Sequence, residues 1–99
     1  MNADSRMSPA LVIDAGDDVA VALADLRAGA TVPLNGRELR LAEEIPAKHK
    51  FALHPIAAGA PVRMYGVTVG IATRDIVPGG RITTENLAHR AEGYSVRSV

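Results

Sequence analysis

The chain has 99 residues, enough for one domain, and its 11 Lys and Arg are balanced by 11 Asp and Glu. With no net charge, two Tyr, one Phe and no Trp, it lacks both the basic field and the stacking surfaces typical of nucleic-acid binding. It has no Cys, which excludes a disulfide framework, a thiolate metal site and a cysteine nucleophile.

The amino-terminal residues are mostly polar or small, without the charged and then apolar profile of a signal peptide. No apolar run approaches the roughly 20 residues that cross a bilayer as a helix. We therefore expect a cytoplasmic protein with no membrane and no nucleic-acid partner. Residues 1–10 are interpreted as a flexible tail, 11–90 as the domain and 91–99 as a second tail.

Short strands follow one another along the chain, because apolar β-branched residues alternate with small or polar ones and turn residues separate the runs. The predicted strands lie at residues 11–14, 19–23, 31–34, 38–42, 50–54 and 62–69. Asn35-Gly36 is a strong signal for a two-residue hairpin between the third and fourth of these strands. The last strand is expected to be interrupted at Gly66.

A twelve-residue pattern occurs three times, at residues 21–32, 51–62 and 71–82. Each copy begins with an apolar residue and Ala, has Leu or Ile at its sixth position and Gly at its ninth, and ends with Val or Ile. Glycine adopts positive φ angles at little cost, so each copy predicts a corner in the chain. The copies are unevenly spaced, which excludes a solenoid.

After the third copy, residues 83–87 resemble a one-turn helix, since a Thr hydroxyl can cap the free amides of a first turn. No segment keeps the 3.6-residue period for three turns. The sequence therefore predicts a mostly β fold of short bent strands with one or two short helical turns.

The residues around the third copy, 72–87, resemble the SAF domain, a β-clip module. A longer set, at residues 18–23, 45–53, 56–59, 62, 65–66 and 71–72, resembles the amino-terminal domain of the altronate and galactarate dehydratase family. In some members of that family this domain is a separate small subunit. The resemblance covers about residues 11–90 and implies a β-clip (SAF-like) fold.

The resemblance implies a component of a hydro-lyase, in which a sugar acid or related 2-hydroxy acid loses water by β-elimination. A large dehydratase subunit is expected to carry most catalytic groups and a divalent metal. This chain is expected to bind no cofactor itself and to be inactive alone. The alternative is a non-catalytic SAF module that binds a carbohydrate or protein surface.

Three residues are candidates for contact with the substrate. The family pattern Ile-Pro-x-x-His-Lys places His49 as a candidate acid or base and Lys50 as a carboxylate-binding group. The residues themselves leave open that His49 shares a strand face with Phe51 and is a packed imidazole. Asn86 is a candidate for substrate binding because it fits the family stretch Val-His-x-His-Asn-Leu.

That stretch also departs from the family, since Thr83 and Glu85 replace both histidines. No metal ligands are assigned in this chain. Asp17-Asp18 could bind a hard cation, although adjacent acidic residues in a turn are more often caps. His49 and His54 are five residues apart and would face opposite sides of one strand.

The small core suggests association with another protein surface. Phe51, Leu53 and Tyr65 are predicted to form an apolar face that is covered by the large subunit or by a second copy of the chain.

Overall fold

The computed structural model describes residues 9–34 and 36–89, and this part of the chain contains strands and turns without a helix. The strands are β1 (Ala10–Leu11), β2 (Val19–Ala22), β3 (Thr31–Leu34), β4 (Arg37–Arg40), β5 (Lys50–Ala52), β6 (Pro61–Met64), β7 (Val67–Ala72), β8 (Arg81–Ile82) and β9 (Leu87–His89). The prediction of a mostly β fold is confirmed. The tails predicted at both ends lie almost entirely outside the described residues.

The helical turn predicted at residues 83–87 is not found. Thr84, Glu85 and Asn86 form a turn in which the Asn86 amide donates to the Thr83 carbonyl at 3.3 Å. The Thr83 hydroxyl does accept a hydrogen bond from the Glu85 amide at 3.0 Å, as a cap would. Leu87 then enters β9 and pairs with Ala72, so the chain returns to a sheet after one turn.

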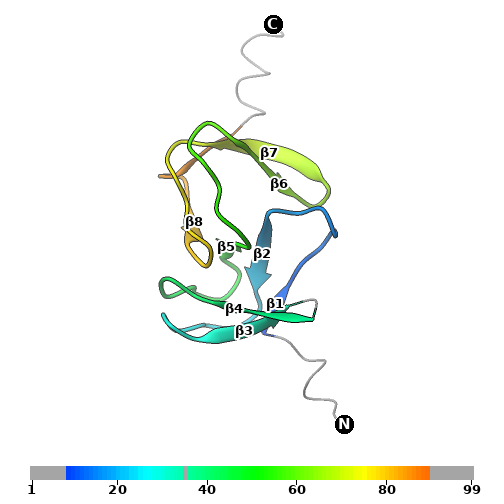
Figure 1. The fold of residues 1–99 in the computed structure, drawn as a ribbon, viewed down its shortest axis with the longest axis vertical. Coiled ribbons are helices and arrows are strands. Elements are labelled where there is room, and N and C mark those ends of the chain that lie inside the picture. Colours follow the sequence, from blue (N-terminus) through cyan, green and yellow to red (C-terminus); the bar gives the residue numbers. More distant parts are fainter. Residues whose placement is uncertain (1–8, 35, 90–99) are drawn as a thin grey trace, which may run out of the picture.

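The strands form a central sheet with a hairpin at either end (Figure 1). The central sheet has the order β1-β2-β5-β8, with all neighbours antiparallel. Strands β3 and β4 make one hairpin, and β6, β7 and β9 make a three-stranded sheet. Strand β5 therefore occupies an inner position, between β2 and β8.

Both hairpins turn through two residues. Between β3 and β4 the predicted hairpin is confirmed, with Gly36 at φ 83°. Between β6 and β7, Tyr65 (φ 58°) and Gly66 (φ 78°) occupy the central positions, both with positive φ as in a type I′ turn. The interruption predicted at Gly66 is thus a second hairpin.

The corner formed by the twelve-residue pattern occurs a fourth time, at residues 40–51, although the sequence there lacks the glycine that marks the other three copies. Ile45 occupies the sixth position, and Lys48 takes the place of the glycine while keeping its positive φ angle, 73°. We call this segment the divergent copy. It shares Phe51 with the copy that follows, because Phe51 ends one copy and begins the next.

The four copies pack in two pairs. Leu26 of the first copy bridges Ile45 of the divergent copy, and Ile56 of the second copy bridges Ile76 of the third. Each pair encloses a hairpin, so residues 21–51 and residues 51–82 are two halves built on one plan. We refer to them as the first half and the second half.

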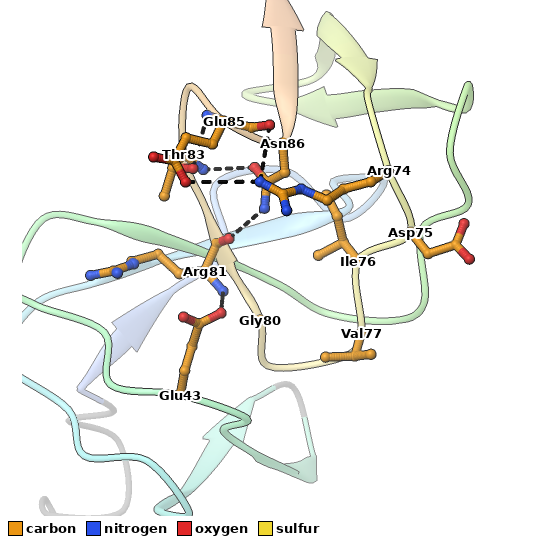
Figure 2. A pocket seen from close by; sticks show the side chains of 10 residues that line it. All are labelled: Glu43, Arg74, Asp75, Ile76, Val77, Gly80, Arg81, Thr83, Glu85 and Asn86. Atoms are coloured by element: carbon orange, nitrogen blue, oxygen red, sulfur yellow. Dashed lines mark hydrogen bonds and ion pairs between the residues drawn. The ribbon is translucent and has the colours of Figure 1, made fainter.

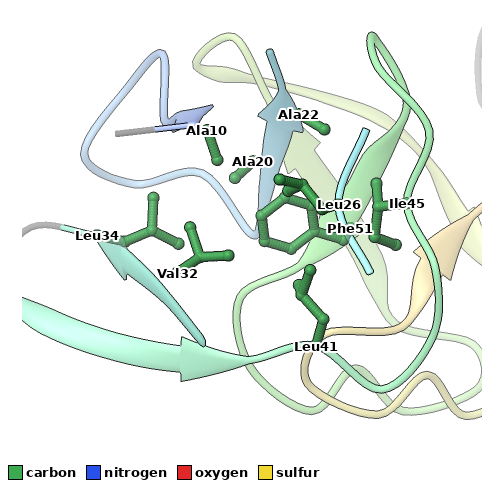
Figure 3. Close-up of a cluster of buried hydrophobic side chains, with 9 residues drawn as sticks. All are labelled: Ala10, Ala20, Ala22, Leu26, Val32, Leu34, Leu41, Ile45 and Phe51. Atoms are coloured by element: carbon green, nitrogen blue, oxygen red, sulfur yellow. The ribbon is translucent and has the colours of Figure 1, made fainter. Parts of the chain in front are cut away.

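Each half has its own apolar core. The first core surrounds the ring of Phe51, which is fully buried between Leu26, Leu41 and Ile45 in Figure 3; its buried members are Ala10, Ala20, Ala22, Leu26, Val32, Leu34, Leu41, Ile45 and Phe51. The second comprises Val19, Ala52, Ile56, Val62, Ala72, Ile76, Ile82 and Leu87. Equivalent repeat positions are therefore buried in both halves, which explains the apolar residues of the pattern.

Candidate functional site

The candidate residues His49 and Lys50 lie at the exit of the divergent copy, where its corner leads into β5. The corner is held by the main chain, since Lys48 donates to the Ala22 carbonyl at 2.7 Å and Ala22 donates to the His49 carbonyl at 2.8 Å. The His49 amide in turn donates to the Pro46 carbonyl at 3.0 Å. The backbone that carries both candidates is therefore fixed by the fold.

The side chain of His49 is exposed. Its Nδ1 lies 3.3 Å from the Ala47 carbonyl oxygen, and within the described residues no group bonds to Nε2. His49 precedes β5 and does not share the buried face of Phe51, so the packed-imidazole alternative is not what the structure shows. An exposed imidazole with a free nitrogen remains accessible to a ligand or a partner.

Lys50 is the first residue of β5 and is partly buried. Its register partners are Val21 on β2 and Ile82 on β8. Ile82 immediately precedes Thr83, the first of the two residues that replace the family histidines. The fold thus brings the His49-Lys50 segment beside the start of the stretch that contains Asn86.

Asn86 uses its side chain to close the turn that follows β8. Its Oδ1 accepts from the Thr83 amide at 2.8 Å, and its Nδ2 donates to the Arg81 carbonyl at 2.8 Å. Both bonds go to the main chain within five residues, so Asn86 shapes this turn. A role in substrate binding stays a prediction, which would use the remaining hydrogen-bonding capacity of the amide.

Asn86 also lines a surface depression of about 330 Å³ (Figure 2). The charged residues that line the depression are Glu43, Arg74, Asp75, Arg81 and Glu85. His49 and Lys50 are absent from this lining, so this depression does not bring the three candidates together. Glu43 accepts the Arg81 amide at 2.8 Å, and the Arg81 Nε is buried without a hydrogen-bond partner among the described residues.

Asp17 and Asp18 hold the hairpin between β6 and β7. Asp17 is buried and accepts the amides of Asp14, Tyr65 and Gly66 at 2.9 to 3.1 Å. Burial tends to raise the pKa of its carboxyl, but these amides and the charge of Arg63 outweigh burial and lower the pKa below its ordinary value.

Asp18 accepts the Arg63 amide at 2.7 Å, and its other oxygen lies 2.9 Å from His54 Nε2. The interpretation of the two acids as local caps holds for the bond of Asp17 to the Asp14 amide, whereas the bonds given for Asp18 go to residues distant in sequence. The bond between the Asp17 carboxylate and the Gly66 amide was not predicted, because nothing in the local sequence connects residue 17 to residue 66.

Metal ligation finds no support in residues 9–34 and 36–89. No three His, Asp or Glu side chains gather there as they would around a cation. These residues therefore do not form a metal cage, and no catalytic step is assigned to a metal held by them. The same segments contain no helix long and apolar enough to cross a membrane.

The prediction that Phe51, Leu53 and Tyr65 form an apolar outer face is wrong. Phe51 is 0% exposed and belongs to the core, whereas Tyr65 is 50% exposed at the tip of a hairpin. Leu53 is partly buried. A single face made by these three residues does not exist.

Comparison with known proteins decides the family. The family described as the altronate/galactarate dehydratase SAF domain matches residues 8–90. The chain belongs to this family. Altronate dehydratase of Escherichia coli (strain K12) is 43% identical to it over 74 residues, which cover 75% of the chain and 15% of that enzyme. The SAF domain expected from the sequence is therefore confirmed, and the chain corresponds to a small part of this relative.

Proposed function

We propose that this SAF domain is the small subunit of a dehydratase-type lyase that removes water from a sugar acid or a related 2-hydroxy acid. The observation that supports the proposal is the match to altronate dehydratase, in which the equivalent segment is only 15% of the enzyme. The larger remainder is the natural place for the groups that the described residues lack. The chain would then act beside a large subunit that holds most of the catalytic groups and the divalent metal.

The reaction defines what each part must supply. A base takes the proton from the carbon next to the carboxylate, a double bond forms, and the neighbouring hydroxyl leaves with a proton from an acid, so that one water is lost. Bound in the large subunit, a divalent metal would stabilise the developing enediolate. The enol product rearranges to a 2-oxo-3-deoxy acid.

In this proposal His49 and Lys50 are the contribution of the small subunit. The exposed Nε2 of His49 donates or accepts a proton, and the Lys50 ammonium binds the substrate carboxylate. Both groups sit on backbone that is fixed by hydrogen bonds, so docking on the large subunit would present them in a defined position. Asn86 supplies a further polar contact from the neighbouring turn.

Co-expression with a large dehydratase subunit tests the proposal. We expect the two chains to purify together and to form the 2-oxo-3-deoxy acid from altronate, galactarate or another sugar acid, while the 99-residue chain alone forms none. Turnover by the chain alone, or no association with any large subunit, would contradict the proposal. A stable chain that binds a carbohydrate without any turnover would instead favour the non-catalytic SAF module.

Variants separate a functional from a structural role. His49→Asn and Lys50→Met should change the free energy of unfolding by about 1 kcal/mol or less, because both side chains reach solvent. Turnover by the assembled enzyme should fall about 10²- to 10⁴-fold. His54→Asn is the matched control, since His54 is also exposed but pairs with Asp18, and it should leave turnover unchanged. Early melting of the His49 and Lys50 variants with normal turnover would make them structural residues.

A further inference from the structure

Lys48 has a backbone conformation that its side chain does not favour. Its φ angle is 73°, in the left-handed region where the Cβ of most residues crowds the following carbonyl. At the same repeat position the first, second and third copies have Gly29, Gly59 and Gly79, with φ between 78° and 87°. Three corners use the residue that makes this conformation easy, and the divergent copy does not.

The fold offers no reason for a lysine at this position. Its side chain is exposed, and within the described residues its ammonium makes no hydrogen bond and no ion pair. Asp25 of the first copy contacts this corner through the main chain, since its carboxylate accepts the Ala47 amide at 2.9 Å. The second half has a bond of the same kind between its copies, in which Asp75 of the third copy accepts the Ala58 amide of the second copy, so that the direction between the earlier and the later copy is reversed.

The corner of the third copy, which is the later corner of the second half, is packed against other parts of the chain. Gly79 and Gly80 are buried, and a Cβ on Gly79 would lie 2.5 Å from the Arg40 carbonyl oxygen. Lys48 and His49 occupy the equivalent positions and are exposed. The corner of the third copy is covered by the chain itself, whereas the divergent corner exposes Lys48 and His49 and is followed by the partly buried Lys50. Gly29 and Gly59 are exposed too, but they bear no side chain.

We infer that Lys48 is an additional ligand-binding residue, and that Lys48 and Lys50 together bind one carboxylate of an anionic ligand. Their Cα atoms can be at most about 7 Å apart, and each ammonium stands on a flexible four-carbon stem, so both can reach the same group. This inference rests on the proposed function for the identity of the ligand, a sugar acid. It gives a functional reason for a lysine with a positive φ angle at residue 48, which contacts within the described residues do not explain.

A titration of the labelled 99-residue chain tests the site without any enzymatic turnover. Galactarate is added while the backbone amide signals are followed by NMR, and inorganic phosphate is added in a parallel titration. We expect galactarate to shift the signals of residues 47–51, with an affinity that falls as salt rises because the site is exposed. Absence of these shifts, or shifts with phosphate and none with galactarate, would overturn the assignment.

Two substitutions separate the ammonium from the backbone strain. Lys48→Gly removes both and should raise the melting temperature by about 2 to 5 °C, whereas Lys48→Met removes the charge and should leave the melting temperature nearly unchanged. Both should weaken galactarate binding about 5- to 10-fold. Arg27→Met, which removes an exposed cation from the first copy, is the control for general charge and should leave binding unchanged.

The assembled enzyme distinguishes failure of this inference from failure of the proposed function. With an active assembly we expect Lys48→Met to raise KM about 10-fold with little change in kcat, because carboxylate binding is lost and the proton transfer groups remain. An active assembly whose KM does not change would refute the role of Lys48 and leave the proposed function intact. If no assembly is active, the proposed function fails and the NMR titration still decides whether the corner binds carboxylates.

Discussion

The first and second halves of the domain share a plan but differ in how their corners are covered. Leu26 and Ile45 form the bridge of the first half as Ile56 and Ile76 form that of the second. In each half one Asp accepts an amide of the paired copy, Asp25 from the earlier copy and Asp75 from the later one. The halves differ at the end of one corner, where Lys48 and His49 are exposed and their counterparts Gly79 and Gly80 are buried. The buried positions of the repeat are therefore fixed by packing, whereas its exposed positions can change without loss of core contacts.

The largest effect is expected where a corner is packed against the other half. Gly79→Ala should destabilise the domain by about 3 kcal/mol or more, because the new Cβ would meet the backbone of residues 40–42 in addition to the cost of a positive φ angle. Gly59→Ala, with φ 87° and nothing within 4 Å, should cost only about 1 to 2 kcal/mol. Urea unfolding measures both, and equal losses would show that the third copy is no more closely packed than the second.

A second large effect is expected at Asp17, which belongs to neither half and ties the second hairpin to the amino-terminal segment. In Asp17→Asn the NH₂ group would face at least one amide donor in either orientation of the side chain, that of Gly66 or those of Asp14 and Tyr65, so we expect a loss of about 2 to 4 kcal/mol. Asp14→Asn is the control, since among the described residues the exposed Asp14 carboxylate accepts a single hydrogen bond, from the Gly16 amide, and it should cost less than about 1 kcal/mol.

The lowered pKa of Asp17 gives this effect a pH dependence with a defined sign. A carboxyl whose pKa is lower in the folded state stabilises fully above its unfolded pKa, about 3.9, and this contribution disappears as the pH falls through the lower folded value. The difference in stability between the protein and Asp17→Asn should therefore shrink below about pH 4. A difference that stays constant between pH 6 and pH 3 would exclude ionised Asp17 as the stabilising group.

A smaller pair of effects tests the equivalence of the halves directly. Asp25→Ala and Asp75→Ala each remove one exposed carboxylate that accepts a corner amide at 2.9 Å, so each should cost about 0.5 to 1.5 kcal/mol. Thermal or urea unfolding should give values within about 0.5 kcal/mol of each other. Losses that differ more than this would mean that the corners are not energetically equivalent.

The smallest effect is expected where a residue is replaced by its counterpart. Tyr65 has φ 58° in the second hairpin, and the first hairpin has Asn35 in the equivalent place. Asparagine tolerates this conformation better, so Tyr65→Asn should be neutral or stabilising by up to about 1 kcal/mol. A clear destabilisation would show that the half-exposed Tyr65 ring contributes packing that the comparison of the halves does not reveal.

Sequence reasoning recovered those parts of the fold whose signals are local. The corners with Gly29, Gly59 and Gly79 were predicted because glycine marks a positive φ angle, and the first hairpin because of Asn35-Gly36. The divergent copy was missed because Lys48 replaces the marker glycine. The second hairpin was missed because a Tyr gives no sign of a left-handed turn.

The predictions at the site were limited in the same way, because local sequence does not show which side chains the folded chain exposes. The exposure of His49 depends on where β5 begins. His49 could share a strand face with Phe51 only if β5 included residue 49, but β5 begins at Lys50. The bonds of Asp17 to Tyr65 and Gly66 depend on tertiary placement, whereas those of Asn86 are local and depend on the turn that follows β8. Residue types alone indicated which side chains are chemically suitable, and the fold determined which of them are already engaged by the backbone.

The overlap of the two halves at Phe51 has a consequence for fragment experiments. Phe51 fills the first core, yet it also begins the second copy, and β5 pairs with strands from both sides. A cut before Phe51 leaves the first fragment without the ring that fills its core. A cut after β5 leaves the second fragment without the strand that pairs with β8. The repeated plan therefore does not yield two autonomous units, and separately expressed fragments should acquire order only when they are mixed.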